Sequence, residues 1–366
     1  MLLDFLGHWF DILGQYGCFE MASYIRSASL GGFEDLVRSY GINPIDVMKE
    51  VGILPALLRD PDSFINYEHY LNLLEVAAKH CHEECFGLKL STKQTIQTIG
   101  LIGVYMSRQD TVIQALTVAQ KYVYLHADSI MFRVTQLDHQ LCELNFIRLN
   151  ENDSILPQKA QLSIGLIINI FKELIGPSWQ AEQVKLKQAQ PNSTIEQIFR
   201  STFNCPVEFG ADRDALYFPA KLLQARPYHF QEKLVDQLIV QQLETQRLKK
   251  QDNEIQLIES TIKMLLATGD CNIENTALCM GMHPKKLQRI LKDQGTSYRN
   301  VLEEVRKAET LRIMNHHQNI HLTDLALQLG YAELSIFSRK FKSWFGMTPT
   351  EWKGQHLTYD APAILN

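Results

Sequence analysis

The sequence predicts two domains of different class: an α+β N-terminal domain, then an all-α C-terminal domain with two helix-turn-helix units joined by a long helix. Three observations carry this prediction. The chain has 366 residues, more than one compact core usually holds. Strand-like runs alternate with helical segments before residue 225, whereas a helix-turn-helix pattern occurs twice after residue 255. With 45% hydrophobic and 21% charged residues, the composition is that of a soluble globular protein.

The N-terminal part alternates between helical and strand patterns. Helices are expected over residues 34–51, 67–80, 110–122, 157–175 and 194–203, the first interrupted at Gly41-Ile42-Asn43-Pro44 and the third capped by Asp110 or Thr111. Strands are expected near 183–187, 205–209 and 214–218, and SIMFRV and LCELNFIRL flank the polar turn QLDHQ as a hairpin. Helices among antiparallel hairpins favour an α+β fold over an eight-stranded barrel.

Residues 228–250 form a further helical pattern with a possible heptad seam at Leu234, Leu238, Gln241 or Gln242, and Thr245. Two interpretations remain open. The helix either mediates dimerisation or an interdomain contact, or packs on the surface of the N-terminal domain; we favour dimerisation. The polar segment QRLKKQDNE at 246–254 is the best candidate for a linker.

A short pattern repeats in the C-terminal part, as ALCMGM at 277–282 and ALQLGY at 326–331. Gly281 and Gly330 supply the residue tolerant of positive φ that the tight turn of a helix-turn-helix unit requires. An amphipathic helix follows each turn, KKLQRILK at 285–292 and SIFSRKFK at 335–342. Either half alone is also typical of an ordinary all-α core, but the duplication favours two DNA-reading units.

Each amphipathic helix has one apolar and one polar face. The apolar faces contain Leu287 and Leu291, and Phe337 and Phe341. The candidate DNA-binding residues are Lys285, Lys286, Gln288, Arg289 and Lys292 in the first unit, and Ser335, Ser338, Arg339 and Lys342 in the second. A helix can read the major groove when one face packs on a scaffold and the other offers donors, and arginine pairs bidentately with guanine. Lys292 and Lys342, the last residue of each set, are expected to contact phosphate.

Residues 298–316 predict one helix joining the two units, because apolar residues recur there every three or four positions. Thr296 or Ser297 is available as its N-cap. At about 1.5 Å per residue the helix is about 28 Å long, which approaches the ~34 Å of one turn of B-DNA. Both reading helices can therefore enter successive major grooves on one face of a duplex.

The end of the chain carries its own signals. Thr348 and Pro349 predict an N-cap and first residue of a last helix, and Trp344, Phe345 and Trp352 are expected in the core.

The segment LALQLGYAELSIFSRKFKSWFGMTPTEWK at 325–353 resembles the C-terminal signature of the AraC/XylS family of bacterial transcription regulators. The resemblance implies a seven-helix DNA-binding domain over 255–354, with helix-turn-helix units at about 274–294 and 322–345. It also implies base contacts by Lys285, Gln288 and Arg289, and by Ser335 and Arg339. The family commonly has a capping serine at the position of His283, so we expect a weaker cap, while Pro284 suits the first helical turn.

GINPIDVMKEVGILPALLRDPD, CFGLKL and GLIGVYMSRQDTVIQALTVAQKYV resemble the arabinose-binding-type N-terminal domain of such regulators. The resemblance implies an effector-sensing domain at 21–227, to which no pocket residue can be assigned. A helical linker at 228–254 and a C-terminal tail at 355–366 complete the organisation. Residues 1–20 form an N-terminal extension, and we hypothesise that translation begins at Met21, because the sequence from there resembles family starts better.

Together these features predict a cytoplasmic, sequence-specific transcriptional regulator, an activator that responds to a small-molecule effector. Its expected partners are double-stranded promoter DNA, RNA polymerase, the effector and a second copy of the chain. No membrane partner is expected, since no window reaches membrane-spanning length. Residues 251–353 hold 13 Lys and Arg against 12 Asp and Glu, and residues 1–250 hold 23 against 28, so the net charge of −5 resides mainly outside the reading domain.

Two alternatives from other classes are a DNA-modification or repair enzyme that carries an AraC-type module, and an architectural DNA-binding protein. The second alternative predicts a more basic module. We expect no enzyme, catalytic residue or cofactor, because no nucleophile motif or phosphate loop is present. HCHEEC at 80–85 lacks a second ligand pair with finger-like spacing, so no metal is expected. The seven cysteines show no secreted-scaffold spacing, which is typical of reduced thiols.

Overall fold

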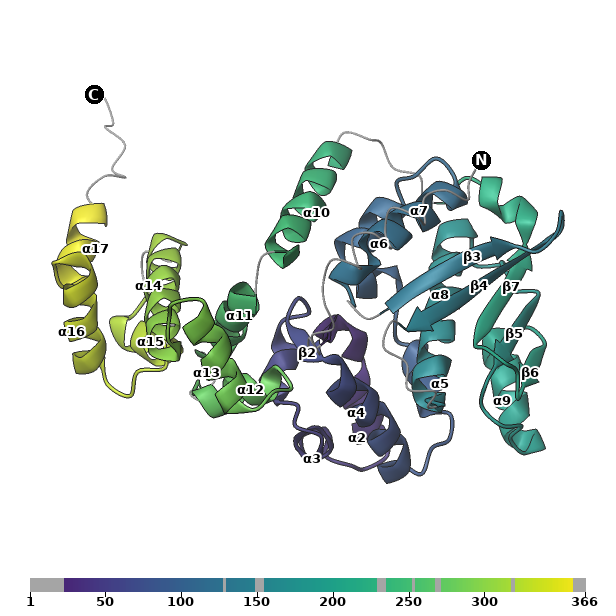
Figure 1. Ribbon diagram of the computed structural model, residues 1–366, viewed down its shortest axis with the longest axis horizontal. Helices are drawn as coiled ribbons and strands as arrows, with labels where there is room; N and C mark the ends of the chain where they lie inside the picture. Colours follow the sequence, from purple (N-terminus) through teal and green to yellow (C-terminus); the bar gives the residue numbers. More distant parts are fainter. Residues whose placement is uncertain are drawn as a thin grey trace, which may run out of the picture.

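A computed structural model describes residues 23–127, 130–148, 155–228, 235–251, 254–266, 271–316 and 320–357. The predicted extension at residues 1–20, the start at Met21 and most of the C-terminal tail lie outside these ranges. The described chain forms an N-terminal part of helices and two sheets, and a C-terminal part of helices alone (Figure 1).

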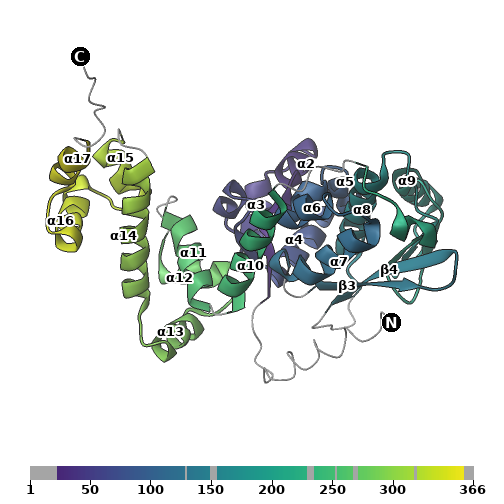
Figure 2. The same cartoon turned by 90° about the horizontal axis from the view of Figure 1, so that it is seen from above.

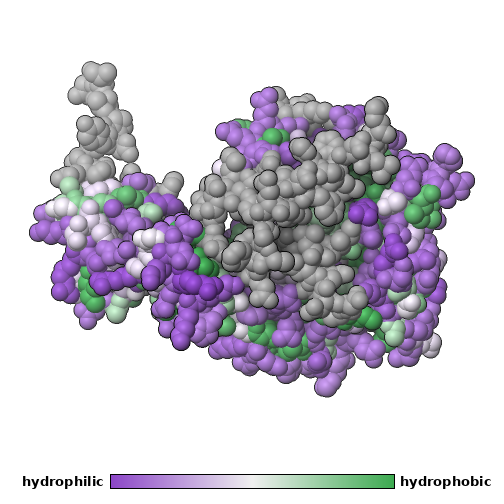
Figure 3. All heavy atoms as spheres, in the orientation of Figure 1, coloured by the Kyte–Doolittle hydropathy of each residue, from purple (hydrophilic) through white to green (hydrophobic). Residues whose placement is uncertain are grey.

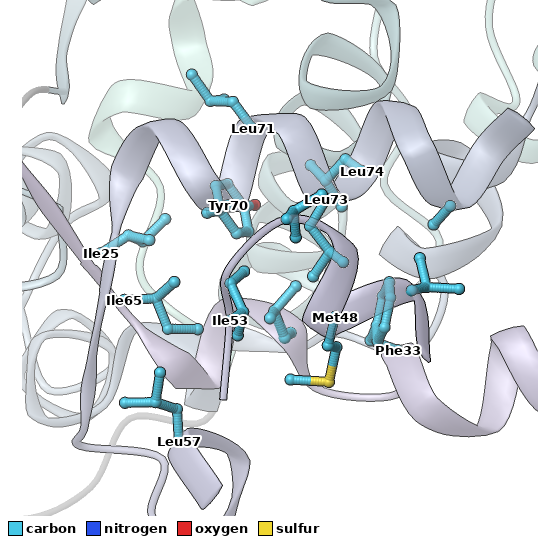
Figure 4. Packing of buried hydrophobic residues seen from close by; sticks show 14 of the residues in the cluster. Ile25, Phe33, Met48, Ile53, Leu57, Ile65, Tyr70, Leu71, Leu73 and Leu74 are labelled. Carbon is cyan, nitrogen blue, oxygen red and sulfur yellow. The ribbon is translucent and has the colours of Figure 1, made fainter. Parts of the chain in front are cut away.

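The first part of the N-terminal domain is a small helical subdomain built around a two-stranded sheet. β1 (Tyr24–Arg26) pairs antiparallel with β2 (Phe64–Asn66), and neither strand was predicted. Around them lie α2 (Phe33–Ser39), α3 (Pro44–Glu50), α4 (Tyr67–His80) and α5 (Phe86–Ser91). In Figure 4, Leu73 of α4 lies toward Met48 and Phe33, and all three side chains are buried. The expected break near Gly41 divides residues 34–51 into α2 and α3, since Asn43 caps α3 and Pro44 begins it.

The second part is a mixed five-stranded sheet in the order β3-β4-β7-β5-β6. Its strands are β3 (Ile130–Gln136), β4 (Leu141–Arg148), β5 (Gln183–Leu186), β6 (Val207–Phe209) and β7 (Ala215–Pro219). The β3–β4 hairpin confirms the prediction for the segments around QLDHQ. The predicted strands near 183–187 and 205–209 are β5 and β6. They pair in parallel, a pairing that was not predicted, because α9 (Ser193–Phe203) crosses over between them.

Helices cover the sheet and complete the N-terminal core. α8 (Pro157–Ile175) has the predicted bounds, and its buried Ile164, Ile168 and Phe171 join the same cluster as the inward residues of β4, β5 and β7. α6 (Leu101–Met106) was not predicted. α7 (Val112–Tyr122) begins at a capping box between Thr111 and Gln114, which identifies the predicted cap as Thr111.

Between the domains, the described residues 235–251 are helical. α10 (Asp236–Gln251) packs on α6 and α7 through the buried Ile239 and Leu243, and Glu244 accepts hydrogen bonds from Lys121 at 2.8 Å and Tyr122 at 2.6 Å. The predicted polar linker therefore forms the end of α10 up to residue 251 and the start of α11 (Glu254–Leu266).

The C-terminal domain consists of α11 and six further helices in the described chain (Figure 2). They are α12 (Ile273–Cys279), α13 (Pro284–Asp293), α14 (Tyr298–His316), α15 (Leu322–Gln328), α16 (Leu334–Phe345) and α17 (Pro349–Leu357). This is the seven-helix arrangement that the resemblance implied. Across the described ranges, no helix combines the length and the apolar character needed to cross a membrane.

One hydrophobic core holds the C-terminal helices together. The predicted apolar stripes are buried in it, and their members are Leu287, Leu291, Phe337 and Phe341. The ring of Phe341 packs against the ring of Phe345 at a tilt of 56°, with ring centroids 4.6 Å apart. Trp344, Phe345 and Trp352 pack partly buried against the same core, which confirms that expectation.

We predict that neighbouring residues of α16 differ sharply in their effect on stability. Phe341→Ala should lower the free energy of unfolding by about 3–5 kcal/mol, because it empties a fully buried site. Lys342→Ala, on the exposed face, should change it by no more than about 0.5 kcal/mol. Chemical unfolding of the full chain measures both. Similar losses for the two variants would show that the faces of α16 are assigned wrongly.

Candidate nucleic-acid interface

The first helix-turn-helix unit consists of α12, a tight turn and α13. Gly281 in the turn has φ of +61°, a conformation that glycine adopts without strain. The Nδ1 atom of His283 accepts a hydrogen bond from the backbone N–H of Lys285 at 3.2 Å, and Pro284 is the first helical residue. α13 therefore forms with an imidazole cap where the family has a hydroxyl, as expected.

The second unit consists of α15, its turn and α16. Gly330 has φ of +70°, which repeats the conformation of Gly281. Glu333 precedes α16 without capping it through its side chain; instead its carboxylate accepts a hydrogen bond from the Ser335 hydroxyl at 2.9 Å. The Ser335 hydroxyl therefore uses its one donor within the second unit and keeps its acceptor capacity.

The predicted DNA-binding residues divide between the two helices. The exposed ones are Lys285, Gln288, Arg289 and Lys292 on α13, and Ser335, Arg339 and Lys342 on α16. Lys286 and Ser338 are half-buried. The structure thus gathers the candidates into two separate surfaces, each opposite a buried stripe. We define these surfaces as the α13 reading face and the α16 reading face. The C-terminal helices in Figure 3 present a mainly hydrophilic surface.

α14 joins the two units and has the predicted bounds, Tyr298–His316. The Ser297 hydroxyl accepts from the backbone N–H of Asn300 at 3.3 Å, so Ser297 rather than Thr296 provides the cap. In Figure 2, α13 lies near one end of α14 and α15 near the other.

Arg306 of α14 holds the turn of the second unit, a role that the sequence analysis did not find. Its Nε donates to the carbonyl of Leu329 at 2.9 Å and its Nη2 to the carbonyl of Gly330 at 3.1 Å. Its guanidinium also lies over the ring of Tyr331, 4.4 Å from the centroid. Three contacts from one side chain thus fix the turn to the linking helix.

Glu303, one turn earlier on α14, fixes α16 itself. Its carboxylate accepts from Trp344 Nε1 and from Lys340 Nζ, each at 2.9 Å. The hydrogen bonds from Trp344 and from Lys340 lower the pKa of Glu303. Lys340 is therefore directed to the scaffold, and the cations of the α16 reading face are Arg339 and Lys342.

Thr348 and Glu351 begin α17 with reciprocal hydrogen bonds of 3.2 Å and 2.7 Å, which confirms the predicted N-cap.

The HCHEEC segment engages other protein groups. His80 pairs with Glu50 at 2.8 Å, and Glu83 binds Lys89 at 2.6 Å and Tyr40 at 2.8 Å. Within the described ranges, no three or more His, Cys, Asp or Glu side chains are grouped so that they could hold a metal ion.

Burial raises the pKa of each described cysteine thiol. The affected residues are Cys81, Cys85, Cys142, Cys205, Cys271 and Cys279. The pKa of Cys85 and that of Cys279 rise to about 12, which is the opposite of what a nucleophilic thiolate requires.

Two protein-family models match the chain in its two domains. Residues 41–227 match the arabinose-binding domain of AraC transcription regulator, N-term, and residues 276–355 match a helix-turn-helix domain. The chain is 26% identical to the HTH-type transcriptional regulator VirS of Mycobacterium tuberculosis, over 91% of this chain and 97% of that protein. It is 25% identical to the ornithine utilization regulator of Pseudomonas aeruginosa, over 87% and 93%. The crystal structure of the transcriptional regulator CdpR from P. aeruginosa aligns with a TM-score of 0.42 and 19% identity, over 87% of this chain and 97% of that chain.

The first of these family matches alone covers more than half of the chain. The second begins within α12 and covers the turns and the reading helices of both units described above. The chain therefore belongs to the AraC family of DNA-binding transcriptional regulators, with an arabinose-binding-type N-terminal domain and a helix-turn-helix C-terminal domain.

Proposed function

We propose that this regulator reads promoter DNA by placing α13 and α16 in successive major grooves. The observation that carries the proposal is the pairing of a buried apolar stripe with an exposed polar stripe on each helix, on a core organised around α14. A helix held in this way presents donors to base edges while its scaffold stays outside the groove. We also propose the predicted domain boundaries: an effector-sensing domain at 21–227, a helical linker at 228–254 and a DNA-binding domain at 255–354.

The residues of the two reading faces have different roles in this proposal. Arg289 and Arg339 contact guanine, because an exposed guanidinium can donate two parallel hydrogen bonds to one base edge. Gln288 contacts adenine, and Lys285, Lys286, Ser335 and Ser338 add contacts around these bases. Lys292 and Lys342 lie later on their helices and bind phosphate, which positions the protein without reading sequence.

We predict that the arginine and lysine variants separate these roles. Arg289→Ala and Arg339→Ala should each reduce discrimination against a wrong base by about 1–3 kcal/mol. Lys292→Ala and Lys342→Ala should weaken binding to all sequences alike and reduce the slope of affinity against salt by about 1. Fluorescence anisotropy titrations, with DNA selected by the wild-type chain, measure both effects.

Arg38→Ala is the matched control, because Arg38 is an exposed arginine on α2 of the other domain and should leave DNA binding unchanged. Unchanged base preference in both Arg289→Ala and Arg339→Ala would refute the assignment of the reading faces.

We further propose that the N-terminal domain senses a small-molecule effector and that the regulator is a cytoplasmic activator that acts with RNA polymerase. The family match over 41–227 supports a sensing role. An effector that binds one arrangement of the two domains more tightly shifts the population toward that arrangement. The raised thiol pKa values and the absence of a metal cluster among the described residues give no support to the repair-enzyme alternative. We also propose that the protein is not an enzyme and uses no cofactor, because the families that it matches are transcription regulators.

Dimerisation through α10 is the remaining part of the proposal. Ile239 and Leu243 pack on the chain's own N-terminal domain, whereas Leu238, Gln241 and Gln242 face solvent. The exposed residues belong to the predicted heptad seam, so intramolecular packing leaves the seam exposed at Leu238 and at Gln241 or Gln242. Leu234 of the same seam lies outside the described residues. Leu238 is 65% exposed, which favours a second copy of the chain as the partner of this face.

We predict that Leu238→Asp converts the full-length dimer into a folded monomer. The substitution places a charge in the seam but disturbs no buried contact, so thermal stability of the monomer should be retained. Size-exclusion chromatography with light scattering measures the mass. Leu137→Asp, at a 50% exposed leucine in the β3–β4 turn, should remain dimeric. A wild-type chain that stays monomeric, or a dimeric Leu238→Asp variant, would refute the α10 interface.

A further inference from the structure

The turns of the two helix-turn-helix units are equivalent in sequence but are held by different parts of the chain. Met280 in the first turn corresponds to Leu329 in the second, at the same place in ALCMGM and ALQLGY. The carbonyl of Leu329 accepts from Arg306 of α14. The carbonyl of Met280 instead accepts from the Tyr24 hydroxyl at 3.0 Å, in a buried hydrogen bond from β1 of the N-terminal domain.

Tyr24 is embedded in the C-terminal core although it belongs to the N-terminal domain. It is only 7% exposed and packs in the cluster that contains Met280, Leu287 and Leu291. In the reverse direction, Cys279 of α12 packs in the N-terminal cluster with residues of β1, β2 and α4. The end of α12 is therefore shared between the two cores.

Asn66 makes a second contact with the first turn. A Cβ atom on Gly281 would lie 2.0 Å from Asn66 Nδ2, whereas one on Gly330 would meet nothing nearer than Arg306 Nη2 at 3.3 Å. Asn66 is itself fixed, because its Oδ1 accepts from the backbone N–H of His69 at 3.1 Å to cap α4. The backbone of the first turn thus rests directly on a rigid part of the N-terminal domain.

A third contact lies beside the first two. A Cβ atom on Gly52 would lie 3.2 Å from Leu278 Cδ1 and 3.3 Å from His69 Cε1, so the partly exposed Leu278 of α12 reaches the loop after α3. Burial lowers the pKa of His69. The N-terminal domain therefore holds the first turn at its carbonyl, its glycine and its preceding leucine.

We propose that Tyr24 and Asn66 are positioning residues for α13, and that the N-terminal domain completes the first reading unit as Arg306 completes the second. The inference rests on the proposed DNA-reading function. A rearrangement of β1, β2 or the start of α4 would then alter the α13 reading face directly. The α16 reading face, held by Arg306 and Glu303 within its own domain, would keep its orientation. The N-terminal domain would thereby act on one half of the DNA site.

The test uses the full-length chain and DNA selected by the wild-type protein. Arg289→Ala and Arg339→Ala first identify the base positions read by α13 and by α16. Tyr24→Phe, which keeps the ring and removes the hydrogen bond to Met280, should then reduce discrimination about threefold to tenfold at the α13 positions only. Arg306→Lys is the matched variant for the turn of the second unit. It should reduce discrimination at the α16 positions only.

A purely structural role for Tyr24 would weaken binding at both sets of positions or at neither, and either result overturns the proposal while leaving the proposed function intact. If the two arginine variants identify no base positions at all, the proposed function fails and this inference fails with it.

A double-mutant cycle tests the Asn66 contact independently of Tyr24. Gly281→Ala should reduce discrimination at the α13 positions more than Gly330→Ala does at the α16 positions. Both substitutions place alanine at a positive φ, but only the Cβ atom of Gly281→Ala clashes with Asn66. Asn66→Ala should recover part of the loss in the Gly281→Ala chain. Additive losses in the double variant would overturn the contact between Asn66 and the first turn.

Discussion

The packing of Leu287, Leu291, Phe337 and Phe341 into one core determines which sides of α13 and α16 remain in solvent. Side chains three or four residues apart lie on the same face of a helix. When one face is buried, the side chains on the opposite face are therefore the ones exposed to solvent. Both helices carry their arginine on that exposed side. The reading faces, the roles proposed for their residues and the choice of variants all depend on this single constraint.

Electrostatics alone would not identify this domain as a DNA binder. Residues 251–353 hold 13 basic and 12 acidic side chains, so their net charge is small. The structure shows how a nearly neutral domain can still present local positive charge: Lys340 is neutralised by Glu303 and Lys263 by Glu309, whereas Arg289 and Arg339 remain exposed on the reading faces. Such a distribution favours recognition by a few directed contacts over a broad attraction to phosphate.

Elements with strong periodicity could be predicted from the sequence almost to the residue. The helices at 67–80, 157–175 and 298–316 have the expected bounds. β1 and β2 were missed because a strand of three residues is too short to show an alternating pattern. The parallel pairing of β5 with β6 was missed because a local pattern defines a strand but not its neighbour.

The reading faces could also be predicted, because each lies within one helix, but the residues that hold them could not. Tyr24 lies 256 residues from Met280, and no local pattern links the two. Arg306 resembles any other exposed arginine on the polar side of a helix until its contacts with Leu329 and Gly330 are seen. The duplicated turn was the one signal for these residues in the sequence. Each copy contains a backbone carbonyl, that of Met280 or Leu329, which needs a hydrogen-bond donor when it is buried.

The central claim is that two reading helices on one scaffold occupy successive major grooves of one duplex. Methylation interference at guanine N7, with the full-length chain on its selected DNA, tests this claim most directly, because N7 lies in the major groove. The account predicts two clusters of interfering guanines about 10.5 base pairs apart, on the same face of the helix. One cluster alone, or two clusters separated by half a turn, would contradict it.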